Sequence, residues 1–118
     1  MAATALDDVV LENLAQQFRG ELIRSGDTQY DAARAVWNGA IDRHPGLIAR
    51  CTGAADVRAA VRFARERDLL VAVRGGGHNV AGTAVCDGGL VIDLSPMKGL
   101  WVDPARRTAR AQPGLLWS

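Results

Sequence analysis

Apolar residues near the start of the chain recur at a helical spacing. Four of them follow one another at intervals of four: Val10, Leu14, Phe18 and Leu22. This stripe predicts an amphipathic helix that continues through Leu22. Residues 4–7, Thr-Ala-Leu-Asp, match a capping box, in which side-chain oxygens bind free amides at a helix start. A short second helix is predicted over residues 31–37, and the Asn-Gly pair at 38–39 is expected to end it.

The middle of the chain predicts a strand, a helix and another strand in succession. Residues 47–51 form a short apolar run, and Thr52 stands where a helix N-cap belongs. A helix is predicted over residues 56–67, because its apolar residues share one face. Residues 69–73 are a continuous apolar run, which is typical of a strand buried on both faces of a parallel sheet. Together these segments predict a βαβ unit with a right-handed crossover.

Beyond this unit the pattern predicts strands without a further helix. A third strand is expected over residues 90–94, after a glycine-rich stretch at 74–89. Residues 101–103 and 107–111, joined by a turn that contains proline, resemble a hairpin. Three large apolar residues at 115–117 then begin a segment that stops at the last residue. We therefore expect the chain to be truncated relative to its natural fold.

Composition narrows the class of protein. Of the 118 residues, 48% are hydrophobic, which is enough to bury a core, and the formal net charge is +1. A nucleic-acid or membrane-surface binder normally carries a strongly basic face, so this balance argues against both. No apolar run approaches the ~20 residues that span a bilayer, and the acidic N-terminus is unlike a signal peptide. Two cysteines are too few for a disulfide framework, so we expect a cytoplasmic protein.

The stretch that carries candidate chemistry is rich in glycine and follows a predicted buried strand. It reads Arg74-Gly-Gly-Gly-His78-Asn-Val-Ala-Gly82. Without Cβ atoms, three successive glycines can turn several backbone amides toward one point, and converging amides bind a phosphate. Ligands of such sheets bind at the carboxyl ends of the strands, where this loop lies. Arg74 could add positive charge at the same place.

Two common phosphate motifs do not fit this stretch. The dinucleotide pattern G-x-G-x-x-G, counted from Gly75, needs glycine where Val80 stands. The nucleotide-triphosphate loop nearly fits from Gly77 onward, but Thr83 replaces the lysine that must reach the phosphates. From spacing alone, the glycines could also form a tight turn between packed strands, and His78 could be a hydrogen-bonded loop residue. Neither histidine has a neighbour at metal-ligand spacing, so no metal site is predicted.

A family resemblance rests on this stretch and on a second one. The sequence VAVRGGGHNVAG at 71–82, followed by DGGLVIDLS at 87–95, resembles the FAD-binding domain of the vanillyl-alcohol-oxidase and p-cresol-methylhydroxylase (PCMH) flavoproteins. It is most similar to the bacterial berberine-bridge-enzyme-like FAD-linked oxidases, over about residues 30–118. The resemblance implies an α+β fold, whose first subdomain is a small parallel βαβ sheet flanked by helices, plus the start of a second subdomain. Residues 1–42 would form an N-terminal helical segment, and residues 43–118 the N-terminal part of the PCMH-type domain.

The resemblance also implies which residues hold FAD. The backbone of the glycine-rich segment would wrap the FAD pyrophosphate, and a final glycine would close the turn. The residues carried over are Arg74, Gly75, Gly76, Gly77, His78, Asn79 and Gly82. His78 would form an 8α-histidyl bond to the flavin, since a neutral imidazole is a nucleophile toward the electrophilic methide form of the ring's 8-methyl group.

The activity implied is that of an FAD-linked oxidase. The full enzyme would take a hydride from a small organic or sugar substrate to flavin N5, and oxygen would reoxidise the flavin. No residue of this chain is proposed as the catalytic base, because the rest of the FAD domain and the substrate domain are expected to be missing. We expect the isolated chain to bind FAD poorly, to expose apolar surface and to be inactive. Asp93 is expected to orient a loop, with cofactor contact as the alternative.

Two other interpretations remain open at this stage. One is a flavin reductase of the same fold that binds FAD without a covalent bond, such as the reductases of cell-wall UDP-sugars. The other is a non-catalytic domain that binds a phosphate-bearing ligand or sequesters a drug. Some relatives also carry a second flavin link through cysteine. Cys51 lies in a predicted strand and Cys86 follows the histidine too closely, so neither is a good candidate for that link.

Overall fold

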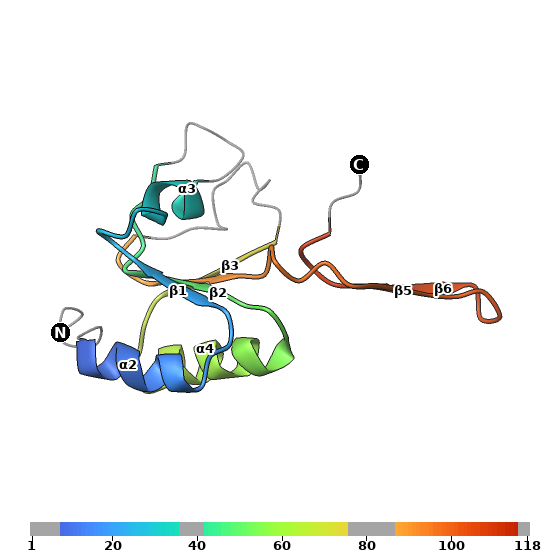
Figure 1. Cartoon of the computed structure of the whole chain (residues 1–118), viewed down its shortest axis with the longest axis horizontal. Coiled ribbons are helices and arrows are strands. Elements are labelled where there is room, and N and C mark those ends of the chain that lie inside the picture. The colour runs from blue at the N-terminus through green and yellow to red at the C-terminus, as the bar shows by residue number, and fades with distance from the viewer. Residues whose placement is uncertain (1–7, 36–41, 76–86, 116–118) are drawn as a thin grey trace.

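A four-stranded sheet forms the centre of the molecule (Figure 1). The computed structural model describes residues 8–35, 42–75 and 87–115. In spatial order the strands are β1 (Glu21–Arg24), β2 (Leu47–Arg50), β4 (Leu90–Asp93) and β3 (Val71–Arg74). Strands β2, β4 and β3 are mutually parallel, and β1 pairs antiparallel with β2. The parallel strands expected from the apolar runs are therefore present.

Helices cover both faces of the sheet (Figure 1). Helices α2 (Asp8–Gln16) and α4 (Ala54–Glu66) pack on one face, and the short helix α3 (Tyr30–Arg34) packs on the other. Successive side chains of a strand point to opposite faces, so the two central strands contribute to both cores. The α2/α4 core contains Leu47, Ala49, Leu90 and Ile92, and the α3 core contains Ile23, Tyr30, Ile48, Ala72 and Val91.

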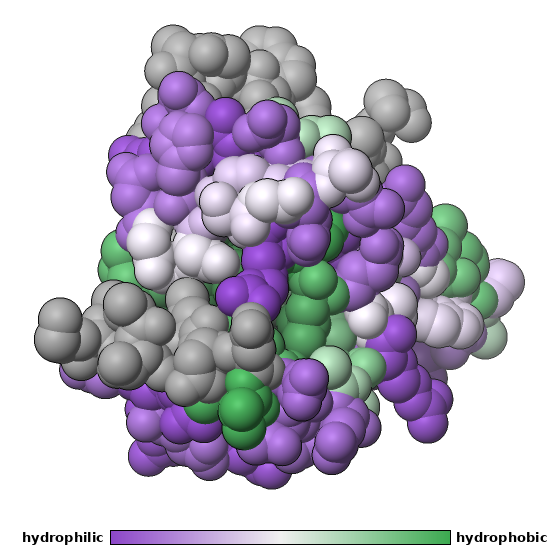
Figure 2. Space-filling view, turned by 60° about the vertical axis from the view of Figure 1, so that its left-hand side comes forward, coloured by the Kyte–Doolittle hydropathy of each residue, from purple (hydrophilic) through white to green (hydrophobic). Residues whose placement is uncertain are grey.

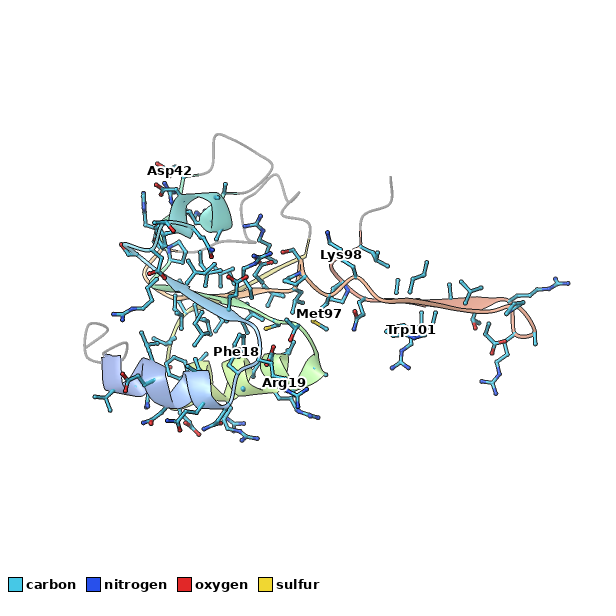
Figure 3. The ribbon with its side chains drawn as sticks, in the orientation of Figure 1. Phe18, Arg19, Asp42, Met97, Lys98 and Trp101 are labelled. Atoms are coloured by element: carbon cyan, nitrogen blue, oxygen red, sulfur yellow. The ribbon has the colours of Figure 1, made fainter. Side chains whose placement is uncertain are left out.

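The predicted first helix is too long, and a strand was missed. Helix α2 ends at Gln16, and Leu22 lies in β1. Phe18 still packs into the α2/α4 core, as its position in Figure 3 shows, but it lies beyond the helix. The chain turns there because the carboxylate of Asp56 binds the amides of Arg19 and Gly20, at 2.8 and 3.0 Å. A contact across the fold thus overrides a local helical pattern.

The helix after β2 begins at Ala54, two residues before the predicted start, and its N-cap lies one residue after the expected one. Gly53 occupies the N-cap of α4 and makes no side-chain hydrogen bond there, so the prediction of Thr52 as the N-cap is wrong. Thr52 instead donates its amide and its hydroxyl to Asp56 Oδ2, at 3.0 and 2.8 Å. The cap is displaced because Asp56, in the first turn of α4, satisfies the donors that precede the helix.

Asp56 makes the stability of the fold sensitive to acid. Burial alone would raise the pKa of this carboxyl group, but four hydrogen bonds outweigh burial and hold the pKa below its usual value. The stabilisation is therefore complete above about pH 4, the ordinary carboxyl pKa, and is lost as the pH falls through the lowered pKa of the folded state. We expect the thermal melting temperature of the wild type to drop as the pH is lowered below about 4. The drop should be smaller in Asp56→Asn, as followed by circular dichroism.

The position of β3 in the sheet differs from the expected one. Strands β2 and β3 are parallel, as a βαβ unit requires, but β4 lies between them. Strand β3 is consequently an edge strand, and Val71 and Val73 are 40% and 55% exposed. The prediction that this strand is buried on both faces is therefore wrong. A continuous apolar run correctly indicates burial for the central strands β2 and β4. The run in β3 is equally apolar, but this strand is partly exposed.

The predicted hairpin is present, and it extends away from the sheet (Figure 1). It consists of β5 (Leu100–Asp103) and β6 (Thr108–Ala111), which pair antiparallel. All residues of both strands are exposed, including Trp101 at 55% (Figure 3). Apolar surface is thus exposed on the hairpin and on β3, whereas the face drawn in Figure 2 is mainly hydrophilic with smaller apolar areas.

Helix α3 is shorter than the helix predicted over 31–37, and the Asn-Gly pair at 38–39 lies outside the described residues, as does the capping box at 4–7. Polar contacts join α3 to the segment before β2. The Tyr30 hydroxyl donates to the Pro45 carbonyl at 2.7 Å, and Arg34 pairs with the carboxylate of Asp42. No helix in the described part of the chain is long and apolar enough to cross a membrane.

Candidate functional site

A row of charged residues marks the edge at which the parallel strands end. Four residues of alternating charge occupy the same register position on successive strands: Glu21, Arg50, Asp93 and Arg74. Each is two residues from a member of the α3 core on its own strand, so all four belong to the α3 face. The carboxyl edge of a parallel sheet is where such folds bind their ligands. The glycine-rich stretch begins at this edge, directly after Arg74.

Asp93 is fixed by its neighbours in this row. Its side chain is 3% exposed, and Arg50 Nε lies 3.5 Å from Asp93 Oδ2. Arg50 also pairs through Nη1 with Glu21 Oε1 at 3.2 Å. Asp93 Oδ1 accepts the amide of Ser95 at 2.9 Å. Asp93 therefore orders the turn that follows β4, which agrees with the expectation that it orients a loop.

A cleft of about 280 Å³ lies between α3 and this edge. Its lining combines apolar and polar side chains: Ile23, Gln29, Ala32, Ala33, Arg50, Arg74, Asp93 and Ser95. Arg74 crosses the cleft to donate from Nη1 to the Ala33 carbonyl at 2.5 Å. Its Nε is buried, and no hydrogen-bond partner for it is found within the described ranges. The guanidinium adds positive charge at the carboxyl edge, beside the cleft, and positive charge there suits a ligand that carries phosphate.

Gly75 has a packing role that its sequence context did not reveal. A Cβ atom on this residue would lie 2.7 Å from the Pro113 carbonyl oxygen, so only glycine lets the two segments approach this closely. Gly114, which follows Pro113 in the chain, is equally enclosed: a Cβ on it would lie 2.4–2.7 Å from the carbonyl oxygens of Ser95, Leu94 and Met97. The chain thus returns from the hairpin to the start of the glycine-rich loop.

The structure brings two of the predicted site residues to this edge, Arg74 and Gly75. The other five lie outside the described residues: Gly76, Gly77, His78, Asn79 and Gly82. The predicted roles of all seven toward FAD therefore stay predictions. The return of residues 113–114 was missed, although a Pro-Gly pair such as Pro113-Gly114 is typical of a turn. The alternating charges were missed as a group, since their alignment depends on strand order.

Cys51 is unsuited to a cysteinyl flavin link, as expected. The residue is fully buried. Burial, followed by the charges of Asp56 and Asp93, raises the pKa of its thiol to about 12. A thiol with this pKa stays protonated at neutral pH and is a poor nucleophile. Cys86 lies outside the described residues.

The fold and the edge described above define a class of FAD-binding protein. Residues 45–118 match the family described as FAD binding domain. The chain belongs to this family, and FAD is its cofactor. The relatives that it matches are FAD-linked oxidoreductases of the PCMH and berberine-bridge-enzyme-like type. This membership confirms the predicted fold class and the family that the glycine-rich motif indicated.

Individual relatives make the similarity specific. (R)-6-Hydroxynicotine oxidase of Paenarthrobacter nicotinovorans is 42% identical over 98 residues, which cover 83% of this chain and 21% of that protein. An FAD-linked oxidoreductase of Aspergillus fumigatus is 36% identical over 93 residues, covering 79% of this chain and 20% of its own length. The chain therefore spans about a fifth of the length of the curated relatives it matches.

Solved structures agree in fold. The crystal structure of 6-hydroxy-D-nicotine oxidase from Arthrobacter nicotinovorans superposes with a TM-score of 0.76 at 42% identity, covering 80% of this chain and 21% of that one. The BBE-like 1 protein of Physcomitrella patens gives a TM-score of 0.77 at 27% identity, covering 85% and 22%. The chain thus shares its fold with both solved structures over most of its length.

Proposed function

We propose that this chain is the FAD-binding part of an oxidase in which the glycine-rich loop holds the FAD pyrophosphate and His78 bonds the flavin. The observation that carries the proposal is the position of Arg74 and Gly75 at the carboxyl edge of three parallel strands, beside a polar cleft. Backbone amides of Gly75, Gly76 and Gly77 would bind the phosphate oxygens. Asn79 and Gly82 would close the loop over them.

His78 would tether the cofactor. Joining an imidazole nitrogen to the carbon of the 8-methyl group removes one hydrogen from each partner. These hydrogens amount to two protons and two electrons, which would reduce one oxygen molecule to hydrogen peroxide, so the balance needs oxygen alone. The tether would prevent loss of FAD during turnover.

The substrate proposed is a small organic molecule or sugar that carries an oxidisable C–N, C–O or C–H centre. Support comes from the relative at 42% identity, whose name assigns 6-hydroxynicotine as its substrate. When bound, FAD supplies the redox chemistry, accepting a hydride at N5 and passing electrons to oxygen. The residues of this chain would bind and orient it, while the catalytic base would come from elsewhere in the protein.

The test uses the product of the complete gene that encodes this chain. The protein is purified, precipitated with acid, and the flavin fluorescence of pellet and supernatant is compared. We expect wild-type flavin in the pellet, because a carbon–nitrogen bond survives acid. His78→Ala should release all of its flavin into the supernatant. The matched control is His44→Ala, because the His44 side chain is 59% exposed and lies before β2, at the opposite edge of the sheet.

Three other outcomes would revise the proposal. Wild-type flavin found wholly in the supernatant would overturn the covalent bond and favour a flavin reductase that binds FAD reversibly. Bound flavin that no alcohol, amine or sugar reduces would favour a non-catalytic binding domain. A colourless protein that ignores added FAD would overturn the proposal as a whole.

A further inference from the structure

Arg74 touches three parts of the fold at once. Its carbonyl oxygen accepts the amide of Leu94 at 2.7 Å, which fixes its backbone to the end of β4. Its Nη1 donates to the Ala33 carbonyl of α3 at 2.5 Å. Its carboxyl-side neighbour, Gly75, lies against the Pro113 carbonyl. A single residue therefore joins the sheet, helix α3 and the first residue of the glycine-rich loop.

The contact with Ala33 has a clear physical basis. The last carbonyls of a helix have no partners within the helix, and an arginine side chain commonly binds them. Helix α3 has five residues, too few to be stable by itself, so contacts with the rest of the fold must hold it. Tyr30 and Arg34 attach it to the segment at 42–45, and Arg74 attaches it at the carboxyl edge.

The contacts of Arg74 differ from those of Arg50, the other arginine in the row of charged residues. Arg50 is paired with two carboxylates, those of Glu21 and Asp93. For Arg74, the contact within the described part of the chain is a neutral carbonyl, and its Nε is left without a partner there. Its guanidinium thus binds α3 through Nη1, while its Nε is enclosed by the protein. An arginine with no other role would be expected to pair with the adjacent carboxylate of Asp93.

We propose that Arg74 is a positioning residue, which caps α3 and thereby holds the entry of the glycine-rich loop in the geometry that binds FAD. This inference rests on the proposed function for its effect on FAD, but not for the capping contact. In this arrangement a displacement of α3 would shift Arg74 through the hydrogen bond to Ala33, and Gly75 would shift because it is bonded to Arg74 in the chain. The FAD affinity therefore depends on a helix that need not touch the cofactor.

The experiment compares Arg74→Met, Arg74→Lys and wild type at position 74 in the product of the complete gene, with His78→Ala in every protein so that no covalent bond holds the flavin. Hydrogen exchange of the segment 30–35 is measured without flavin, and FAD titrations are made at two salt concentrations. We expect Arg74→Met to speed exchange in this segment and to weaken FAD binding by about tenfold, with its salt dependence unchanged. Arg74→Lys keeps a donor and a charge, so it should stay within about threefold of wild type.

A direct role on the phosphate gives a different result. In that case Arg74→Met would flatten the salt dependence of FAD binding, because one charge–phosphate contact is lost, and would leave exchange of α3 unchanged. That result would overturn the positioning role. Arg58→Met, which removes an exposed arginine from α4 on the other face, is the control and should change neither measurement.

Two further outcomes distinguish the failures. If wild type binds no FAD, the proposed function fails, while faster exchange of segment 30–35 in Arg74→Met still supports the capping role. If Arg74→Met exchanges like wild type, the positioning role fails, whatever the FAD titration gives. If Arg74→Met does not fold, Arg74→Gln replaces it, because its shorter neutral side chain cannot reach Ala33 in the same way.

Discussion

Replacing Asp56 with alanine is expected to lower the free energy of unfolding by about 3 kcal/mol. The carboxylate is 2% exposed and accepts the amides of Arg19, Gly20 and Thr52 as well as the Thr52 hydroxyl. Alanine would leave these donors without an acceptor at the junction of α2, β1 and α4. Urea unfolding followed by circular dichroism measures the change.

Two variants test whether the loss comes from these hydrogen bonds. Asp56→Asn keeps one acceptor oxygen and loses the charge, so its loss should be about half that of alanine. Asp27→Ala removes an exposed carboxylate that accepts the Arg24 amide at 2.8 Å, and should cost less than about 1 kcal/mol. A loss in Asp56→Ala as small as that of Asp27→Ala would contradict the assigned role.

Replacing Gly114 with alanine is expected to remove most of the flavin from the purified protein. The added Cβ would lie within 2.7 Å of three carbonyl oxygens, those of Leu94, Ser95 and Met97. Backbone must move to admit it, and the preceding residue, Pro113, lies against Gly75 at the entry of the glycine-rich loop. We expect FAD binding to weaken by about tenfold or more, with a stability loss of about 2 kcal/mol.

Gly53→Ala is the matched control for this substitution. No atom lies within 4 Å of a Cβ built on Gly53, and its φ of −170° is extended backbone that alanine adopts. This control should bind FAD like wild type and lose less than about 1 kcal/mol of stability. A Gly114→Ala protein with the FAD content of wild type would show that the return of the chain to Gly75 does not support the loop.

Local sequence patterns were sufficient to predict the elements that can be recognised from their own residues. The central strands β2 and β4 are short apolar runs, and both faces of each run are buried. The hairpin could be predicted because its turn and its strands are adjacent in sequence. Strand β1 was missed because Leu22 continues the spacing of Val10, Leu14 and Phe18, and the residue that ends the helix, Asp56, lies more than thirty positions away.

The candidate site also combines a part that the sequence could predict with a part that it could not. The glycine-rich motif is contiguous, so its composition indicated phosphate binding and its family before the fold was known. The groups that support it come from distant segments: Ala33 precedes Arg74 by 41 positions, and Pro113 approaches Gly75 only after the hairpin has returned. Alignment of Glu21, Arg50, Asp93 and Arg74 requires the strand order, which no local pattern contains.

The edge position of β3 has a consequence for how the sheet can open. Strand β3 is hydrogen-bonded to the sheet on one side, through β4, and in the described part of the chain no strand pairs with its other side. The sheet can therefore open from this side while β2 and β4 stay paired. The strand that leads to Gly75 is thus the least protected of the three parallel strands.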